Sequence, residues 1–468
     1  MARKYRQNFS NFSIIALLLL IFALPVLVLG TQKIQQLLSE ATGISANIRV
    51  DPTHSLGMIE QNWRAFAQGG EEEGNILTQV VPNVRQLQPQ YIRIDHLYDH
   101  HPTVGRDGNG QLTFNFASLD MVVDSIVATG ATPFLSLSYM PSAIASGDVT
   151  STPRDWSEWA LVVQRTIEHY SGVNNRNLSD VYYEVWNEPD LFGNWKYYGD
   201  KNYLTLYLYA VQGAQNATNT NAFKIGGPAT TQLYKNWIVA LADFVESNNL
   251  RLDFVSWHHY TFDPGEFNTD AGNITEWLRQ YPRFLNTPRI ISEWGFDSNI
   301  NPGYDGNLAA AHTIATVQQA LGVYDQIFSF ELVDGKSPDN QAFWGRWGLL
   351  THPSQGKLPK PRFEAFLLLN QLAGDRLYVA GEGTWVRALA AQDGNTMRIL
   401  LTNYDRYGNH NEVVPVTVSP ITNGTYTIIT KRLNQAEQTQ TTTVTDNNLV
   451  TQLIMQPNNV VLLTINPS

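Results

Sequence analysis

Short apolar runs alternate with longer amphipathic stretches from about residue 55 to residue 374. The runs are rich in β-branched and aromatic residues, which is typical of strands, whereas the longer stretches repeat apolar positions at helical spacing. The expected strands are 56–59, 91–95, 133–138, 181–186, 223–227, 254–259, 289–292 and 327–332. The expected helices include 119–129, 156–169, 233–247, 308–321 and 363–372.

Eight strands that alternate with helices predict an α/β fold in which the strands close into a (β/α)8 TIM barrel. We assign this barrel to residues 55–375. An open dinucleotide-binding sheet is disfavoured because no GxGxxG motif follows an early strand, and no GxxxxGK[ST] phosphate loop is present.

After Gly374 the pattern changes to strand-like runs separated by Gly, Asn, Pro and Thr, at 397–403, 413–418, 425–432 and 460–465. This pattern predicts a C-terminal antiparallel β-sandwich over 376–468. Residues 31–54 are expected to be a linker and a strand that lead into the barrel, with 44–50 adding a strand to the sandwich. The Thr- and Gln-rich run 438–443 is expected to be an exposed hairpin.

The N-terminus has the pattern of a targeting segment. Arg3, Lys4 and Arg6 precede an apolar stretch, 14–29, that is interrupted by Pro25. A basic start followed by an apolar segment predicts a signal peptide or an N-terminal membrane anchor within residues 1–30, and both interpretations stay open. Either one places the remaining chain outside the cytoplasm, secreted or anchored to the outer face of the cytoplasmic membrane.

Composition narrows the chemistry. The net charge of −11 argues against nucleic acid and anionic lipid as partners. The chain has no Cys, which excludes thiol catalysis, disulfides and lipoprotein anchoring. The 12 Trp and 21 Tyr residues indicate either a large core or stacking surfaces for a sugar ring.

Two carboxylates stand at strand ends. The run 181–186 leads into Asn187-Glu188-Pro189, and Pro189 cannot continue a central strand. The run 289–292 leads into Glu293. These are the fourth and seventh expected strands, so both carboxylates should face the mouth of the barrel, where a pair of this kind suits glycoside hydrolysis. Glu184 and Trp186 share the parity of Glu188, and we expect Glu184 to be a buried hydrogen-bond acceptor.

Trp186-Asn187-Glu188-Pro189 together with Ser292-Glu293-Trp294-Gly295 resembles the clan A retaining glycosidases. Segments 91–95, 133–141, 253–260 and 345–351 resemble glycoside hydrolase family 39, the family of β-xylosidases and α-L-iduronidases. The resemblance covers roughly residues 50–375 and implies a barrel beside a β-sandwich. It also implies a polysaccharide or oligosaccharide substrate and no cofactor or metal.

The resemblance implies Glu188 as acid/base and Glu293 as nucleophile. It implies that Asn187 binds the sugar 2-hydroxyl, that Tyr260 holds the nucleophile and that His258 binds a sugar hydroxyl. Arg93 would keep Glu293 ionised, the alternative being a structural ion pair of the barrel. The further residues expected in the sugar-binding set are Asp95, Tyr139, Trp294 and Arg346.

Two departures from the family put xylose in doubt. The family's second strand usually reads Arg-x-His where this chain has Arg93-x-Asp95, and the xylosidases carry a Trp in the eighth strand where this chain reads Phe328-Ser-Phe-Glu-Leu332. Arg346 suggests a preference for an acidic or C5-substituted sugar, because a guanidinium matches a carboxylate. The alternative is that Arg346 pairs with Asp334 or Asp339.

The sequence leaves other classes of function to compare with a hydrolase. A catalytically silent glycan-binding module of the cell envelope is the main alternative. Another barrel enzyme, such as an aldolase or enolase type, would need a Schiff-base Lys or metal-binding carboxylates at several strand ends. The sequence shows neither. A zinc site would need His258, His259, His100 and His101 to converge.

Overall fold

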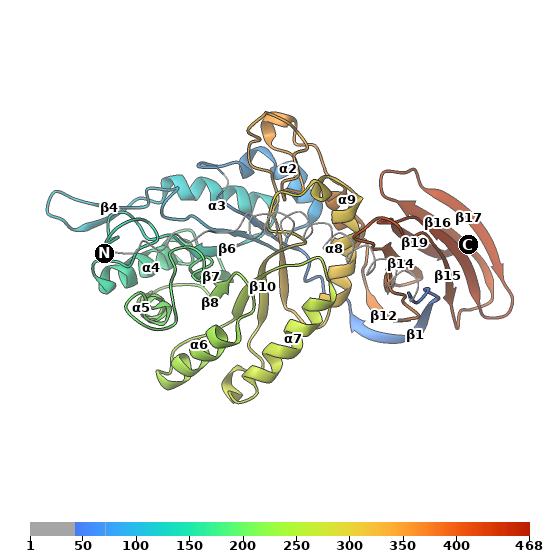
Figure 1. The fold of residues 1–468 in the computed structure, drawn as a ribbon, viewed down its shortest axis with the longest axis horizontal. Helices are drawn as coiled ribbons and strands as arrows, with labels where there is room; N and C mark the ends of the chain where they lie inside the picture. The colour runs from blue at the N-terminus through green and yellow to red at the C-terminus, as the bar shows by residue number, and fades with distance from the viewer. Residues whose placement is uncertain (1–42, 71) are drawn as a thin grey trace, which may run out of the picture.

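The chain forms two lobes that lie side by side in the computed structural model, which describes residues 43–70 and 72–468. In Figure 1 the helix-covered barrel occupies one lobe, and the C-terminal strands occupy the other. Both parts of the predicted architecture, a closed barrel and a separate β-sheet domain, are confirmed.

Eight parallel strands close the barrel. The seventh and eighth strands, β10 and β11, pair with each other, and β11 pairs with the first strand, β2. Phe134, Tyr182, Phe254 and Phe328 are buried together inside it, as the packed interior of a small barrel requires. In chain order the strands are β2 (Ala65–Gln68), β3 (Tyr91–Ile94), β6 (Thr132–Leu137), β7 (Val181–Val185), β8 (Phe223–Thr230), β9 (Val255–Tyr260), β10 (Arg289–Gly295) and β11 (Gln326–Phe330).

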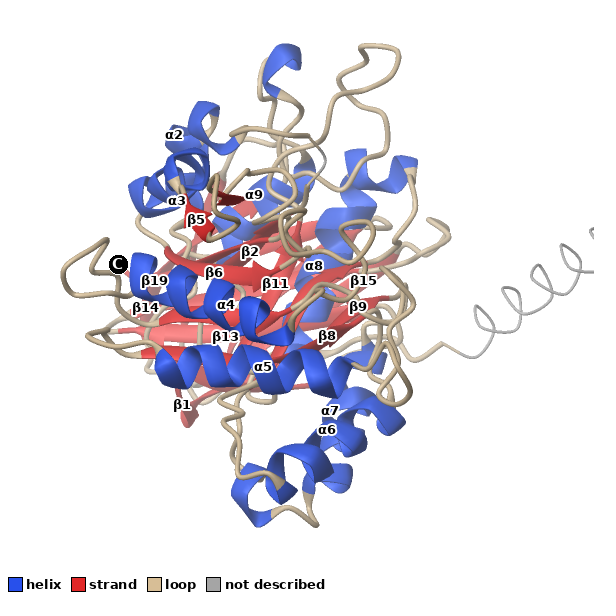
Figure 2. Cartoon of the chain, turned by 90° about the vertical axis from the view of Figure 1, so that its left-hand side faces the viewer, coloured by secondary structure: helices blue, strands red, loops and turns tan. Residues whose placement is uncertain are grey.

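Helices cover the outside of the barrel, and Figure 2 shows α4 and α5 lying across the strands. A small hairpin, β4 (Val104–Arg106) with β5 (Leu112–Phe114), projects from the loop after β3. The helices are α2 (Val81–Val84), α3 (Ala117–Thr129), α4 (Trp156–Tyr170), α5 (Tyr203–Asn216), α6 (Lys235–Ser247), α7 (Gly265–Leu278), α8 (Asn307–Ala320) and α9 (Pro361–Leu369).

The second lobe is a nine-stranded sheet in the order β17-β16-β19-β14-β13-β12-β1-β15-β18. Its pairings are antiparallel except for the parallel pair β1–β15. The expected hairpin is present, because β17 pairs with β16 and its Thr and Gln side chains are mostly exposed. The strands are β1 (Ile48–Met58), β12 (Asp375–Ala380), β13 (Val386–Asp393), β14 (Thr396–Asn403), β15 (Glu412–Val418), β16 (Gly424–Arg432), β17 (Gln438–Val444), β18 (Leu449–Met455) and β19 (Val460–Pro467).

The first barrel strand was predicted at the wrong place. Residues 56–59 do not enter the barrel, because β1 runs through Met58 and pairs with β12 and β15 of the sandwich. The barrel starts instead at Ala65–Gln68, a short run whose two alanines give little strand signal but fit the crowded interior beside Phe328. The expectation that residues 44–50 add a strand to the sandwich is correct for its second half.

The two lobes share a continuous apolar core. Leu389, Leu400 and Leu462 of the sandwich are buried in the same cluster as the residues between the barrel strands and their helices. Helix α8 lies at this junction, against β13, β14 and β19. The sandwich is therefore fixed against the side of the barrel that carries α8.

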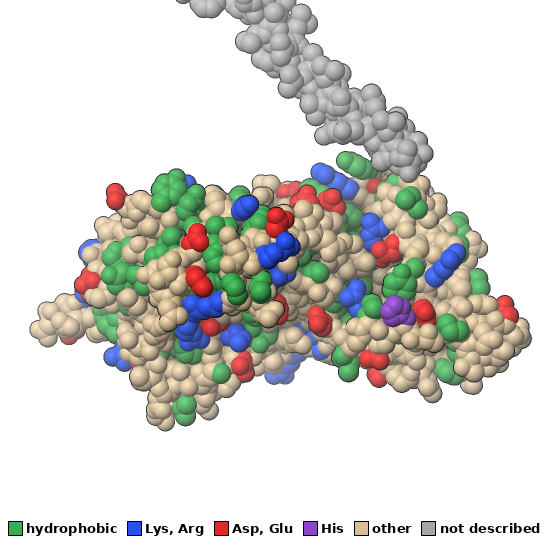
Figure 3. Space-filling view, turned by 90° about the horizontal axis from the view of Figure 1, so that it is seen from below, with side chains coloured by type: hydrophobic (Ala, Val, Ile, Leu, Met, Phe, Trp, Pro, Cys, Tyr) green, Lys and Arg blue, Asp and Glu red, His purple; other side chains and the backbone are tan. Residues whose placement is uncertain are grey.

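No helix within the described residues is long and apolar enough to cross a membrane. The predicted signal peptide or anchor, residues 1–30, lies outside the described residues, so it stays a prediction. On the face drawn in Figure 3, acidic and basic side chains are interspersed with small groups of apolar ones.

Candidate active site

Glu188 lies directly after β7, where the backbone leaves the strand through unusual dihedral angles. Trp186 has φ of 74° and Glu188 has φ of 46°, a left-handed region that costs a residue with a side chain about 1 kcal/mol or more. Neighbouring strands hold this turn. Ser136 donates a hydrogen bond to the carbonyl of Trp186 at 2.8 Å, and the Glu188 amide donates to the carbonyl of Ala229 at 2.9 Å.

Glu293 lies on β10, beside His258 on the adjacent strand β9. Because side chains alternate along a strand, His258 and Tyr260 reach the same side, and the Tyr260 hydroxyl donates to Oε2 of Glu293 at 3.0 Å. The predicted role of Tyr260 as the residue that holds this carboxylate agrees with this contact.

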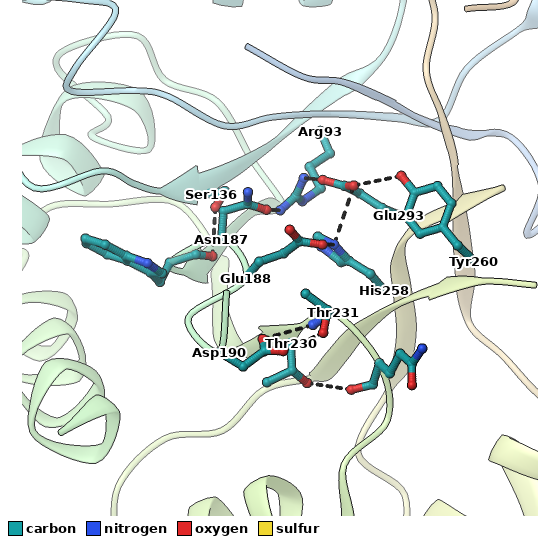
Figure 4. A network of polar contacts seen from close by, with 12 residues as sticks. Arg93, Ser136, Asn187, Glu188, Asp190, Thr230, Thr231, His258, Tyr260 and Glu293 are labelled. Atoms are coloured by element: carbon teal, nitrogen blue, oxygen red, sulfur yellow. Dashed lines mark hydrogen bonds and ion pairs between the residues drawn. The ribbon is translucent and has the colours of Figure 1, made fainter. Parts of the chain in front are cut away.

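Arg93, fully buried on β3, spreads its guanidinium over three partners. Its Nε donates to Glu184, one terminal nitrogen donates to Glu293 and the other donates to the amide oxygen of Asn187, each at 2.7 Å. Arg93 thus makes both of the contacts that were posed as alternatives, a structural ion pair with Glu184 and a pair with the candidate nucleophile Glu293. Figure 4 shows Arg93 beside Glu293 and Asn187.

His258 lies between the two candidate catalytic carboxylates (Figure 4). Its Nδ1 is 2.9 Å from Oε1 of Glu188 and 3.4 Å from Oε2 of Glu293. Burial lowers the pKa of His258, but the two carboxylates outweigh burial and the net pKa is raised. The side chain of His258 is fully buried against Glu188 and Glu293, and its contact with a sugar hydroxyl stays a prediction.

The two candidate carboxylates face each other at short range. Oxygen atoms of Glu188 and Glu293, together with a ring nitrogen of His258, all lie within 4.8 Å of one another. Burial raises the pKa of Glu293 to about 6, although His258 and Arg93 act in the opposite direction. Glu293 is therefore mainly ionised at neutral pH, as a nucleophile must be.

The carboxylates open onto a cavity of about 430 Å³. Asn187 lines this cavity, and both ends of its amide have partners. Its oxygen accepts a hydrogen bond from Arg93, and its nitrogen donates to the Tyr139 hydroxyl at 2.9 Å. Asp95 also lines the cavity, and its Oδ1 is buried with no hydrogen-bond partner. The residues of the predicted set that line the cavity are Asp95, Tyr139, Asn187, Glu188, Tyr260 and Glu293.

Trp294 does not belong to the sugar-binding set. Its side chain is fully buried on the outside of the barrel, where its ring packs on the guanidinium of Arg362 at 4.9 Å and near His312. The physical reason is strand alternation, because an inward Glu293 requires an outward Trp294.

Arg346 stacks its guanidinium on the ring of Trp347 at 3.6 Å, and Trp347 lines the cavity. Arg346 itself does not line the cavity. Asp334 pairs with Lys360 at 2.7 Å. A preference for an acidic sugar stays a prediction.

Several residues that line the cavity were not predicted from the sequence. His96 follows Asp95 and pairs with Asp99 at 2.7 Å, and neighbouring carboxylates outweigh burial and raise its pKa to about 9. Gly69 and Gly70 follow β2, the barrel strand that was not predicted, and a Cβ on Gly70 would lie 2.2 Å from the His96 ring. The glycine pair after an apolar run was the available signal. The remaining missed residues include Phe192, Thr231 and Phe330.

The four histidines considered for a zinc site do not converge within the described part of the chain. His259 pairs with Asp270 of α7 at 2.7 Å, and His101 contacts Ser118 at 2.8 Å. His258 turns the opposite way, toward the carboxylates, so these residues do not form one ligand set.

Residues 46–441 match the family described as Glycosyl hydrolases family 39. The chain belongs to this family. It is a glycoside hydrolase, which agrees with two carboxylates opposed across a cavity at the mouth of a barrel. The catalytically silent module considered above finds no support in these comparisons.

Two β-xylosidases are similar along most of their length. The protein of Caldicellulosiruptor saccharolyticus is 26% identical over 389 residues, which are 76% of this chain and 75% of that protein. The protein of Geobacillus stearothermophilus is 27% identical over 391 residues, 75% of each chain. A monomeric β-xylosidase structure from Caulobacter crescentus covers 90% of this chain and 100% of its own, with 20% identity and a TM-score of 0.77, and so shares the fold.

Proposed function

We propose that this family 39 glycoside hydrolase cleaves β-xylosides and closely related β-glycosides with retention of anomeric configuration. The observation that carries the proposal is the close approach of Glu188 and Glu293, whose oxygens lie within 4.8 Å of each other across the cavity. Retaining enzymes hold their carboxyl groups about 5–5.5 Å apart, whereas inverting enzymes leave about 6.5–9.5 Å for a water molecule.

In the first step an oxygen of Glu293 attacks the anomeric carbon, and the bond from that carbon to the leaving oxygen breaks. Glu188 gives its proton to the leaving oxygen, so the product departs as a neutral alcohol. Arg93 and Tyr260 donate to the Glu293 carboxylate from behind, which keeps it ionised and aimed.

In the second step water attacks the anomeric carbon of the glycosyl-enzyme. Glu188, now a carboxylate, takes the proton of that water, and the bond to Glu293 breaks. Two displacements at one carbon restore its original configuration. The free enzyme regains a protonated Glu188 and an ionised Glu293.

The substrate class rests on the relatives and on the shape of the cavity. Both similar proteins compared above are named β-xylosidases. Phe330 and Trp347, whose ring centroids lie 5.2 Å apart, form an aromatic wall for one face of a sugar. Asp95 offers a buried oxygen acceptor that suits a sugar hydroxyl, although the family usually has a His at that position.

The different roles proposed for Glu188 and Glu293 predict different kinetic defects when each residue is substituted. Glu293→Gln should abolish hydrolysis of every aryl β-xyloside, by about 10⁴-fold or more, because no nucleophile remains. Glu188→Ala should retain glycosylation by substrates with a good leaving group such as dinitrophenolate, and azide should restore turnover and yield a β-glycosyl azide. Steady-state kinetics with a series of leaving groups measures both effects.

Glu276→Gln is the control, because Glu276 is exposed on α7, lines neither cavity and should leave both rates unchanged. Losses in Glu188→Ala that are equal for all leaving groups, without an azide product, would contradict the assigned roles. A wild-type enzyme that is inactive on β-xylosides but active on another aryl β-glycoside would contradict the proposed substrate class and leave the assigned roles of the two glutamates intact.

A further inference from the structure

A second cleft, of about 690 Å³, lies between the barrel and the sandwich and adjoins the catalytic cavity. Tyr260 and Ser298 line both spaces. Its barrel side is formed by the loops after β9 and β10, and its other side by sandwich residues 384–387 and 404–407. A chain attached to a sugar in the catalytic cavity can therefore extend along this junction.

The cleft presents aromatic rings beside polar groups. Tyr407 is 57% exposed, and Trp385 is half-buried with its ring stacked on His410 at 3.6 Å. The guanidinium of Arg406 lies over the Phe262 ring at 3.7 Å. A sugar has apolar ring faces and a rim of hydroxyls, so rings with a polar edge beside them suit it.

The sandwich side of the cleft is already ordered. The buried Asp405 carboxylate accepts hydrogen bonds from the amides of Tyr407, Asn409 and His410 at 2.9, 2.6 and 2.7 Å. The Tyr404 hydroxyl donates to the carbonyl of Phe262 at 2.7 Å, which joins this loop to the barrel. A preformed surface loses little conformational entropy when it binds a ligand.

The charges of the lining favour a neutral ligand. Carboxylates outnumber guanidinium groups, so an anionic chain would meet net repulsion. The acidic residues are Asp263, Glu266, Asp297 and Asp405, and the basic ones are Arg387 and Arg406.

We propose that this junction cleft binds the further sugar units of a neutral β-linked oligosaccharide whose scissile bond lies between Glu188 and Glu293. The proposal rests on the proposed function and deepens it, because it gives the sandwich a direct part in substrate binding. It makes the enzyme prefer chains over short glycosides.

The test compares kcat/KM for an aryl β-xyloside with kcat/KM for β-1,4-xylo-oligosaccharides of two to six units. The wild type should hydrolyse longer chains more efficiently. Tyr407→Ala and Trp385→Ala should each lose about 3- to 10-fold on the longest chain, the usual size of an aromatic contact, and keep the wild-type value on the aryl xyloside. Tyr378→Ala is the matched control, because Tyr378 is an exposed tyrosine of the same domain outside the cleft.

Binding of xylohexaose to the Glu293→Gln protein, measured by calorimetric titration, tests the cleft without turnover. Adding Tyr407→Ala should weaken this binding by a similar factor. Unchanged affinity, equal losses on all chain lengths or a wild type indifferent to length would overturn the cleft proposal. A wild type that binds xylohexaose through Tyr407 yet hydrolyses no aryl xyloside would refute the proposed function and leave the cleft supported.

Discussion

Arg93 lies between Glu184 and Glu293 and donates to both, so one buried cation compensates two carboxylates inside the barrel. A buried charge without a partner is costly, and the geometry here gives each nitrogen of the guanidinium an acceptor. The consequence for catalysis is that Glu293 can stay ionised although burial raises its pKa to about 6.

This pKa predicts the acid limb of the pH profile. The carboxylate of Glu293 must be ionised to attack, so kcat/KM should fall as the pH drops through about 6. The Tyr260 hydroxyl donates a hydrogen bond to the ionised carboxylate of Glu293. Its removal in Tyr260→Phe should shift the acid limb of the profile to higher pH, by roughly half a pH unit to one pH unit.

Tyr281→Phe is a suitable control, because the Tyr281 hydroxyl bonds Asp243 and lies outside both cavities. Its acid limb should coincide with that of the wild type. A Tyr260→Phe profile that keeps the wild-type limb would show that Tyr260 does not tune this carboxylate.

At the scale of elements, strand ends made the candidate site predictable. Pro189 after Glu188 and the aromatic-glycine pair after Glu293 marked two places where an apolar strand meets the mouth of the barrel. The strand order placed them fourth and seventh, and the resemblance supplied Tyr260 and Arg93. The structure brings all four together.

The first barrel strand could not be predicted from its own residues. Ala65–Gln68 is short and carries two alanines, so its strand character comes from the strands on either side of it. The error at Trp294 has another cause, because a motif names residues without saying which side of a strand each one faces. His96 was missed because its place in the cavity depends on how the segments after β2 and β3 meet.

Helices α4 and α5 provide a test of close packing. Gly213 of α5 lies so near α4 that a Cβ would be 2.2 Å from the carbonyl oxygen of Ala160. Gly213→Ala should therefore lower the free energy of unfolding by about 1–3 kcal/mol, although alanine favours helix. Thermal and denaturant unfolding measure the effect.

Gly272 of α7 offers the matched comparison, because a Cβ there meets nothing within 4 Å. Gly272→Ala should raise the free energy of unfolding by up to about 1 kcal/mol through helix propensity alone. If Gly213→Ala also raised the free energy of unfolding, the close approach of α4 and α5 would be refuted.

At the scale of the whole molecule, barrel and sandwich are tied twice. Strand β1 precedes the barrel in sequence but pairs with β12 and β15, and Leu389, Leu400 and Leu462 of the sandwich share the barrel's outer core. We therefore expect a single calorimetric unfolding transition, with calorimetric and van't Hoff enthalpies that agree. Two resolved transitions would show that the lobes unfold independently.

The central claim is that Glu293 forms a covalent bond with the sugar during turnover. The most direct measurement treats the enzyme with a 2-deoxy-2-fluoro-β-xyloside that carries a dinitrophenolate leaving group and then analyses the intact protein and its peptides by mass spectrometry. The account predicts one fluoroxylosyl unit per chain, attached to Glu293, and no label in Glu293→Gln. A label on another residue, or fluorosugar turnover to the inverted anomer without any adduct, would contradict it.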